Sequence, residues 1–167
     1  MTDSFYPKAS RYFADLAPGR PIFQGDIFRG RGYGILLPQP CDFSEQEKGA
    51  THPFRLVAPL FPLDARAGVD HALVRAGRVG HTLWVPRWDN RGPQDYFADL
   101  RLATSIDATF LTRETRVAAL SSAAWLSMAD RLSRYFVGIP LDATAFAVQQ
   151  GWLHPDSPGS GSATSRT

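Results

Sequence analysis

The chain has 167 residues, 44% of them hydrophobic, which suits one domain with one core. Its 18 basic and 16 acidic side chains give a formal net charge of +2, so the total indicates no dense cationic surface for nucleic acid. The single cysteine, Cys41, excludes an intramolecular disulfide and a thiolate-rich zinc site, and no apolar stretch approaches the about 20 residues that cross a bilayer. We therefore expect a cytoplasmic domain without membrane contact.

A short helix is predicted near the N-terminus, over Ser10–Leu16, because aromatic and apolar residues recur there at helical spacing before a proline- and glycine-rich stretch. We treat residues 1–21 as an N-terminal extension that carries this helix. Residues 22–154 are expected to form a single domain of strands and a helix. Residues 155–167 are glycine-, serine- and threonine-rich, and this composition predicts a disordered tail.

Five runs of β-branched and aromatic residues, each bounded by glycine or proline, predict short strands of a small barrel or sandwich. The runs are Ile22–Phe28, Tyr33–Pro38, Phe54–Phe61, Val79–Pro86 and Tyr96–Leu111. The last run is long enough to bend or to contain a break. Gly30 and Gly32 suit a tight hairpin turn between the first two strands, and the polar segment Gln39–Pro53 is predicted to be a surface loop.

From Ser121 the apolar residues recur at a period near 3.6, which predicts an amphipathic helix. The apolar face contains Trp125, Met128, Ala129, Leu132, Tyr135 and Phe136. The opposite face, predicted to be solvated, contains Asp130, Arg131 and Arg134. Ser121 or Ser122 is the expected N-cap, and Gly138 with Pro140 ends the helix. A shorter helix is predicted over Ala143–Gln150.

The run Pro38–Asp42 places the only thiol beside a carboxylate where a strand enters a loop, a position at which scaffolds present reactive groups. A nucleophilic cysteine needs a base or a cation that lowers its thiolate pKa, whereas the charge of Asp42 would raise the pKa of Cys41. A histidine could supply the base only if the fold brings it close. A structural thiol, or an aspartate that shapes a turn, remains the alternative.

Asp26 is expected to be structural, and two of the histidines are not expected to bind a metal. Asp26 follows a glycine and precedes an apolar residue, so it can bond nearby backbone N–H groups in a turn. His71 and His81 lie in a region interpreted as strand, loop and strand, without the short spacing of a helical metal pair. The chain also has no glycine-rich phosphate loop, so neither a metal nor a cofactor is expected.

The segment from Arg87 to Arg91 places an indole, Trp88, between two guanidinium groups. A nucleic acid base could stack on the indole while the arginines contact phosphates. Tryptophan and arginine also dominate the hot spots of protein interfaces. The sequence leaves an RNA contact, a protein contact and an inert loop as alternatives for this segment.

Five motifs along the chain follow the order of a known family. They are Gly25-Asp26-Ile27, Ile35-Leu36-Leu37, Leu56-Val57-Ala58-Pro59, the run Asp99–Leu111, and Arg116-Val117-Ala118-Ala119-Leu120 before the helix. From about Phe23 to Val137 the chain resembles the PemK/MazF-type toxins, whose small SH3-like barrels form dimers and cleave RNA. The resemblance implies a mainly β fold of the α+β class, an SH3-like barrel with a C-terminal helix.

The catalytic positions of that family are not matched. The family has an arginine-proline pair entering its second strand, where this chain reads Gly32-Tyr33-Gly34, and its threonine after the third strand would fall near Leu60 or Phe61. Cleavage of RNA through the 2′-hydroxyl needs a general base and a cationic group that stabilises the developing charge. Neither is present at the matching positions.

We therefore predict a non-catalytic binding or adaptor domain of toxin–antitoxin or antiviral-defence type that binds a protein partner, with RNA binding and a homodimer left open. Residues 39–42 are also similar to a Ser-Gln-x-Cys-Asp element of bacterial proteins near defence genes. The alternative is an endoribonuclease whose active groups have moved to Arg29, Arg31, Arg87 and Asp42. The candidate binding residues are Arg29, Arg31, Cys41, Asp42, Arg87, Trp88 and Arg91. Convergence of the active groups in one concave site would separate the two functions.

Overall fold

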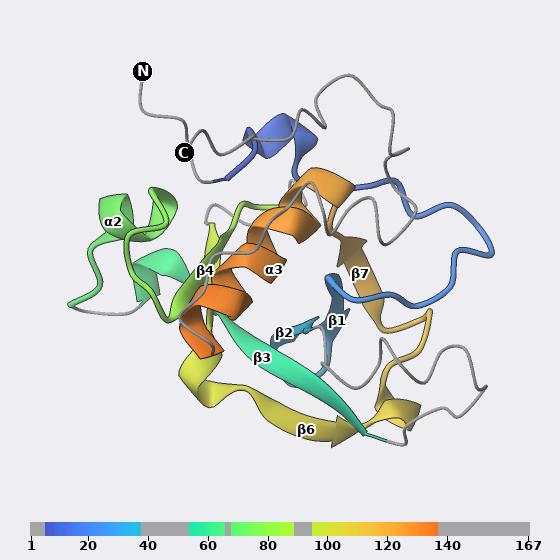
Figure 1. Ribbon diagram of the computed structural model, residues 1–167. Helices are drawn as coiled ribbons and strands as arrows, with labels where there is room; N and C mark the ends of the chain where they lie inside the picture. The colour runs from blue at the N-terminus through green and yellow to red at the C-terminus, as the bar shows by residue number, and fades with distance from the viewer. Residues whose placement is uncertain (1–5, 38–53, 66–67, 89–94, 137–167) are drawn as a thin grey trace, which may run out of the picture.

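The computed structural model describes residues 6–37, 54–65, 68–88 and 95–136. Within these ranges the chain forms an antiparallel sheet in the order β4-β5-β3-β2-β1-β7, and β6 pairs with β3 beside this path. Figure 1 shows that the sheet curls into a half-barrel and that helix α3 crosses one of its faces. The predicted class, mainly β with a helix toward the C-terminal end of the described chain, is confirmed at this level.

The strands are β1 (Asp26–Arg29), β2 (Tyr33–Leu36), β3 (Phe54–Pro62), β4 (Thr82–Val85), β5 (Tyr96–Asp99), β6 (Thr104–Asp107) and β7 (Arg116–Ala119). The predicted break in the run Tyr96–Leu111 is present, because the 3-10 turn η4 (Leu100–Leu102) separates β5 from β6. The hairpin predicted at Gly30 and Gly32 also forms, with Arg29 paired to Tyr33 across it.

Three parts of the strand prediction are wrong. β1 begins at Asp26 rather than Ile22, because the Asp26 carboxylate accepts from the Phe23 N–H at 2.9 Å and holds a turn before the strand. β4 begins at Thr82, since the Thr82 N–H and hydroxyl both donate to the Val79 carbonyl. β7 is absent from the predicted strands, because its partner β1 lies about 90 residues away in the chain, as the Asp26 to Arg116 separation shows.

The segment before β4 contains α2 (His71–Arg75) in place of the expected strand and loop. The helix begins where the Asp70 carboxylate accepts from the N–H groups of Ala72 and Leu73, at 2.9 and 3.0 Å. This is an N-cap, which satisfies backbone donors that the first turn leaves unpaired. The preceding 3-10 turn is η3 (Leu63–Ala65).

The register of the sheet gives it two different faces. Ile27 and Ala58 both pair with Ile35, so their side chains project to the same side, toward α3. The main core lies there and includes Leu83, Val85, Ala98, Trp125 and Met128. The other face carries a smaller cluster of Phe28, Leu36, Val57 and Leu111.

Helix α3 (Ser122–Phe136) confirms the predicted helix and its cap, because the Ser121 hydroxyl oxygen accepts from the Ala124 N–H at 3.3 Å. Two assignments of its faces are wrong. Arg131 is 5% exposed instead of solvated, and its guanidinium donates to the Gly77 carbonyl beyond α2. Phe136 is 58% exposed instead of buried, because it occupies the last position of the helix. None of the helices in the described ranges is long and apolar enough to cross a membrane.

The predicted helix over Ser10–Leu16 does not form, and only a 3-10 turn, η1 (Ala9–Arg11), precedes Tyr12. Phe13 instead forms an antiparallel bridge with Leu120, and the Ala14 N–H donates to the Ala119 carbonyl at 2.9 Å. These bonds need an extended backbone. Pairing with the β7 edge therefore overrides the helical spacing of the sequence.

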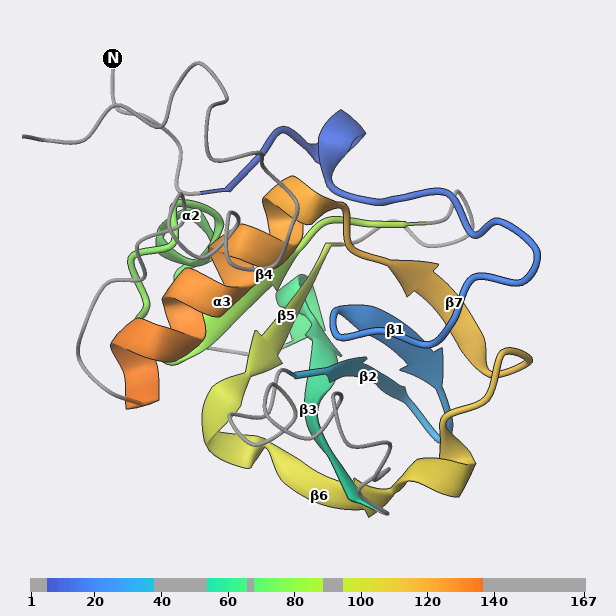
Figure 2. The same ribbon diagram turned by 45° about the vertical axis from the view of Figure 1, so that its right-hand side comes forward.

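Tyr6 and Tyr12 connect the same segment to the opposite edge of the sheet. The Trp84 N–H in β4 donates to the Tyr6 hydroxyl at 3.2 Å, and the Tyr12 hydroxyl donates to the Trp84 carbonyl. Because β4 and β7 are the two ends of the strand order, residues 6–14 bond both edges. Figure 2 shows this segment passing the first turn of α3, where the Ser121 N–H donates to the Tyr12 carbonyl at 2.9 Å.

The predicted helix over Ala143–Gln150, the stop at Gly138 and Pro140, the loop Gln39–Pro53 and the tail 155–167 lie outside the described residues. They remain predictions from the sequence.

Substitution of Leu132 tests the packing of α3 against the sheet. Leu132→Ala is expected to lower the free energy of unfolding by about 2–5 kcal/mol, because it removes buried methylene groups and leaves a cavity. Phe136→Ala, on the exposed end of the same helix, should change it by less than about 0.5 kcal/mol. Urea denaturation measures both values, and equal losses would contradict the burial of Leu132.

Removal of the Tyr12 hydroxyl tests the hydrogen bond between the N-terminal segment and β4. Tyr12→Phe leaves the Trp84 carbonyl without this donor, and we expect a loss of about 1–3 kcal/mol in the free energy of unfolding. Tyr135→Phe, on a partly exposed side chain of α3, is the matched control.

The same tyrosines predict how stability changes in alkali. Burial raises the pKa of Tyr6 and, to a larger extent, that of Tyr12 above the ordinary value of 10.0. The unfolded chain therefore loses protons first, and the free energy of unfolding falls as pH rises above 10.0. In chemical denaturation between neutral pH and alkali, this fall should be shallower in Tyr12→Phe than in wild type. An unchanged slope would contradict the burial of the hydroxyl.

Candidate functional site

Four of the predicted site residues lie in the described part of the chain: Arg29, Arg31, Arg87 and Trp88. The other three, Cys41, Asp42 and Arg91, lie outside the described residues. The proposed chemistry of the Cys41-Asp42 pair therefore remains a prediction from the sequence.

The β1–β2 hairpin presents two cationic side chains. Arg29 ends β1 opposite Tyr33, and Arg31 lies in the turn, where the Gly30 N–H donates to the Gly32 carbonyl at 2.7 Å. Both arginines are exposed, and neither side chain has a hydrogen-bond or ion-pair partner among the described residues. The hairpin therefore offers two guanidinium groups to an external ligand.

An aromatic cluster, defined here as Phe13, Tyr33, Trp88 and Tyr96, lies beside this hairpin. The rings of Trp88 and Tyr96 stack with centroids 4.6 Å apart and an angle of 30°. Tyr33 lies nearly perpendicular to both rings, at 4.9 Å from Trp88 and 5.6 Å from Tyr96. All four side chains are partly buried and pack against the main core. Mutual packing thus fixes the rings while leaving part of each exposed.

Cross-strand pairing places the cationic and aromatic groups together. Arg29 and Tyr33 are register partners, so their side chains project from the same face of the sheet. Trp88, which follows Arg87, contacts the Tyr33 ring. The segment after β4 and the β1–β2 hairpin, separated by more than 50 residues in the sequence, therefore contribute to one surface.

Asp95 holds the segment that carries Trp88. Its carboxylate accepts from the Trp84 indole N–H at 3.1 Å, from Arg75 Nε at 2.9 Å and from the Arg87 backbone N–H at 3.3 Å. These donors belong to β4, α2 and the residue that precedes Trp88. No local pattern around Asp95 indicates this role, because the donors lie 8 to 20 positions away from it.

Asp26 confirms its predicted turn contact, but its main partners are arginines. Besides the Phe23 N–H, the fully buried carboxylate accepts from Arg116 at 3.0 Å and from Arg20 at 3.2 Å. Arg116, whose side chain is also buried, donates in addition to the carbonyls of Pro21 and Arg20. The group joins β1, β7 and the segment before β1, so its role is structural.

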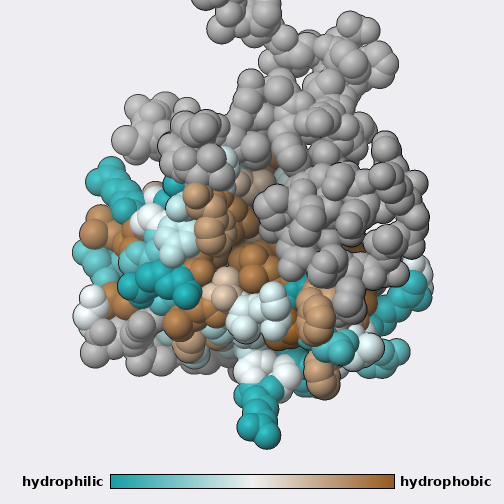
Figure 3. Space-filling model, turned by 60° about the horizontal axis from the view of Figure 1, so that its bottom comes forward, coloured by the Kyte–Doolittle hydropathy of each residue, from teal (hydrophilic) through white to brown (hydrophobic). Residues whose placement is uncertain are grey.

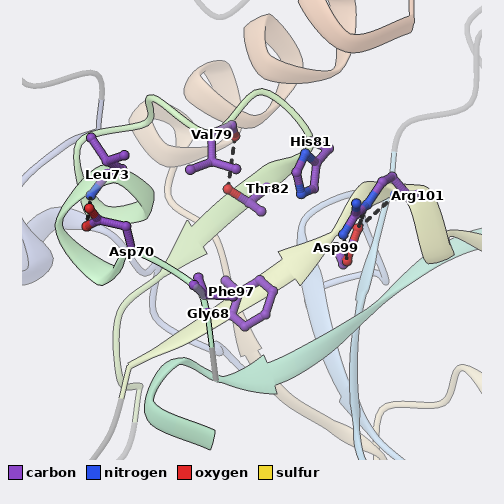
Figure 4. A pocket seen from close by; sticks show the side chains of 10 residues that line it. Gly68, Asp70, Leu73, Val79, His81, Thr82, Phe97, Asp99 and Arg101 are labelled. Carbon is purple, nitrogen blue, oxygen red and sulfur yellow. Dashed lines mark hydrogen bonds and ion pairs between the residues drawn. The ribbon is translucent and has the colours of Figure 1, made fainter. Parts of the chain in front are cut away.

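A pocket of about 430 Å³ lies between the α2 segment and β5 (Figure 4). Its apolar walls are Leu73, Val79 and Phe97, and its polar lining includes Asp70, His81, Thr82, Asp99 and Arg101. Asp99 is fully buried and accepts from Arg101 Nε at 2.9 Å and Nη2 at 2.7 Å. These hydrogen bonds raise the pKa of Arg101. Of these residues, only His81 was weighed from the sequence as a possible site residue.

The two aspartates, the threonine and the arginine of this pocket already have partners within the protein. Asp99 binds Arg101, the Thr82 hydroxyl donates to Val79, and Asp70 caps α2. Ligand pockets instead place a few polar groups where they converge on the ligand. No set of three His, Cys, Asp or Glu residues in the described ranges could hold a metal ion. The pocket is therefore a weaker candidate than the aromatic cluster.

Exposed apolar side chains also occur near β6, at Phe54, Leu102 and Phe110. Figure 3 shows brown and teal residues interspersed on the lower face of the molecule. Scattered exposed apolar residues are normal on protein surfaces and indicate no binding site by themselves. The surface formed by the aromatic cluster, Arg29 and Arg31, which have no partner in the described part of the chain, remains the candidate site.

Comparison of the chain with protein-family models and with curated proteins gives no match. The geometry of β2 bears on the resemblance noted from the sequence. A Cβ atom on Gly34 would lie 2.6 Å from Cγ1 of Val57, so a larger residue there needs the Val57 side chain to shift. The stretch Gly32-Tyr33-Gly34, which the resemblance aligns with the family's arginine-proline pair, therefore leaves little room for a side chain at position 34.

Removal of the Asp26 charge tests its structural role. Asp26→Asn should lower the free energy of unfolding by about 3–5 kcal/mol, because it leaves the buried Arg116 without its anionic partner. Asp130→Asn, which breaks the more exposed pair with Arg134 on α3, should cost about 0.5 kcal/mol or less. Urea denaturation at neutral pH measures both, and a loss for Asp26→Asn as small as the control's would contradict the structural role.

Proposed function

We propose that this chain is a binding domain that docks a protein partner at Arg29, Arg31 and the aromatic cluster. The observation that carries the proposal is two exposed arginines without described partners beside rings that are already packed. Tryptophan, tyrosine and arginine are enriched at protein interface hot spots. Because the rings hold one another in place, little side-chain entropy is lost when a partner binds.

Within this proposal the domain is an adaptor of toxin–antitoxin or antiviral-defence type, built on a degenerate PemK/MazF-like barrel. The curled antiparallel sheet with a helix packed on one face is compatible with such a barrel. The short approach of Gly34 to the Val57 side chain, which leaves little room for a larger residue, supports loss of the family's catalytic pair. The proposed activity is therefore binding without catalysis.

An endoribonuclease is the second candidate, and one observation favours it. Trp88 contacts Tyr33, which lies on the hairpin that carries Arg29 and Arg31. Arg87 immediately precedes Trp88, so the segment that contains Arg87 lies next to this hairpin. A ribonuclease also needs a general base within reach of the reacting hydroxyl. Asp95, the carboxylate nearest Arg87 in the hydrogen-bond network, already accepts three bonds from the protein. Protein binding is therefore favoured.

Incubation with a long single-stranded RNA in the presence of a chelator separates the two functions. The purified protein is expected to leave the RNA intact, because Asp95, the carboxylate bonded to the Arg87 backbone, already accepts three hydrogen bonds within the fold. The readout is RNA length on a denaturing gel. Metal-independent cleavage that Arg87→Ala abolishes would instead establish the ribonuclease.

Substitution of Trp88 tests the docking surface itself. Trp88→Ala should weaken the complex with a partner isolated from the source organism by about 2 kcal/mol or more, roughly thirtyfold, because it removes the central ring of the cluster. Phe110→Ala removes a ring that is 72% exposed on another part of the surface, and it should leave the affinity unchanged. Titration of each variant with the isolated partner gives the comparison, and equal losses would argue against this surface.

A further inference from the structure

We infer that the docked partner presents an acidic segment, whose carboxylates bind Arg29 and Arg31 while a neighbouring apolar side chain covers the aromatic cluster. This inference rests on the proposed protein-binding function and names the chemistry of the partner. It is carried by the distribution of charge over the described surface and by the geometry of the hairpin.

Intramolecular carboxylates neutralise many of the arginines in the described ranges. The ion pairs are Arg20 and Arg116 with Asp26, Arg75 with Asp95, Arg101 with Asp99, and Arg134 with Asp130. Arg29 and Arg31 have no such partner among the described residues. The net charge of the chain is only +2, but the β1–β2 hairpin carries two arginines that no described carboxylate neutralises.

The position of the two arginines suits a short anionic segment. Arg29 is the last residue of β1 and Arg31 lies two positions later in the turn, so both guanidinium groups belong to one end of the hairpin. A guanidinium binds a carboxylate through two parallel N–H donors. Two acidic residues in one partner segment can therefore be bound together, next to the Tyr33 ring.

The same geometry favours an acidic protein segment over RNA. Single-stranded nucleic acid is held by a groove of cations that follows several phosphates and by rings on which successive bases stack. Among the described residues, the hairpin next to the cluster contributes two arginines without partners, and one face of the Trp88 indole is already covered by Tyr96. The surface of the Trp88 indole that Tyr96 leaves open can still contact an apolar side chain of a protein partner.

The test uses three fluorescent probes with the full-length protein. One is a synthetic peptide of aspartate and glutamate around a central tryptophan. The second has the same sequence with asparagine and glutamine in place of the acids, and the third is oligouridine. Fluorescence anisotropy should detect binding of the acidic peptide but not of the other two probes. The affinity for the acidic peptide should fall several-fold as the salt concentration rises from about 50 to about 200 mM.

Charge reversal assigns the binding to the hairpin. The double variant Arg29→Glu and Arg31→Glu should bind the acidic peptide at least about tenfold more weakly, because attraction becomes repulsion. Arg31→Glu alone should also weaken binding. Its matched control is Arg78→Glu, which changes the net charge by the same amount, since Arg78 is an exposed arginine that precedes β4, at the opposite end of that strand from Arg87. The control should change the affinity less than about twofold. Unchanged melting temperatures establish that all of these variants are folded.

Three outcomes would overturn the inference. If Arg78→Glu weakened peptide binding as much as Arg31→Glu, the affinity would depend only on the net charge of the protein. Equal binding of the amide peptide, or stronger binding of oligouridine that the hairpin variant abolishes, would assign another ligand to the surface. The acidic peptide could fail to bind while Trp88→Ala still weakens the complex with the isolated partner. In that case the inference of an acidic segment is wrong, and the proposed docking function stands.

Discussion

The half-barrel depends on hydrogen bonds that pair backbone groups at the outer edges of its two end strands, β4 and β7. An edge strand exposes unpaired N–H and C=O groups, which are costly when buried and prone to pair with other chains when exposed. Here Trp84 of β4 bonds to the hydroxyls of Tyr6 and Tyr12 through both its N–H and its carbonyl. Two residues beyond Tyr12, the Ala14 N–H bonds to the β7 edge. One short segment thus closes the sheet at both ends.

This closure extends to the candidate binding surface. Phe13, which pairs with Leu120 at the β7 edge, also contributes a ring 6.5 Å from that of Trp88. Trp84, held at its backbone by the two tyrosines, bonds through its indole to Asp95, and Asp95 in turn holds the Arg87 backbone. The positions of the aromatic cluster therefore depend on the same contacts that close the sheet, so loss of the N-terminal segment would alter both.

Charge is arranged in two ways in this molecule. Buried carboxylates such as Asp26 are bonded by arginine, and removal of either partner from such a pair leaves an uncompensated charge in the interior. The exposed arginines of the β1–β2 hairpin have no such partner among the described residues, and in our proposal they attract the acidic segment of the partner. An arginine-rich composition alone does not distinguish these uses, because the difference lies in which carboxylate folds against which guanidinium.

The local pattern of residues determined the elements whose signals lie within a few positions of one another. These include β2, β3, the hairpin at Gly30 and Gly32, and α3 with its Ser121 cap. It also drew attention to Trp88 as a surface residue. Only the tertiary structure decided the extended path of residues 12–14, the strand β7, the burial of Arg131 and the role of Asp95. Each of these depends on a partner between 8 and more than 100 positions away, and no local periodicity records such a partner.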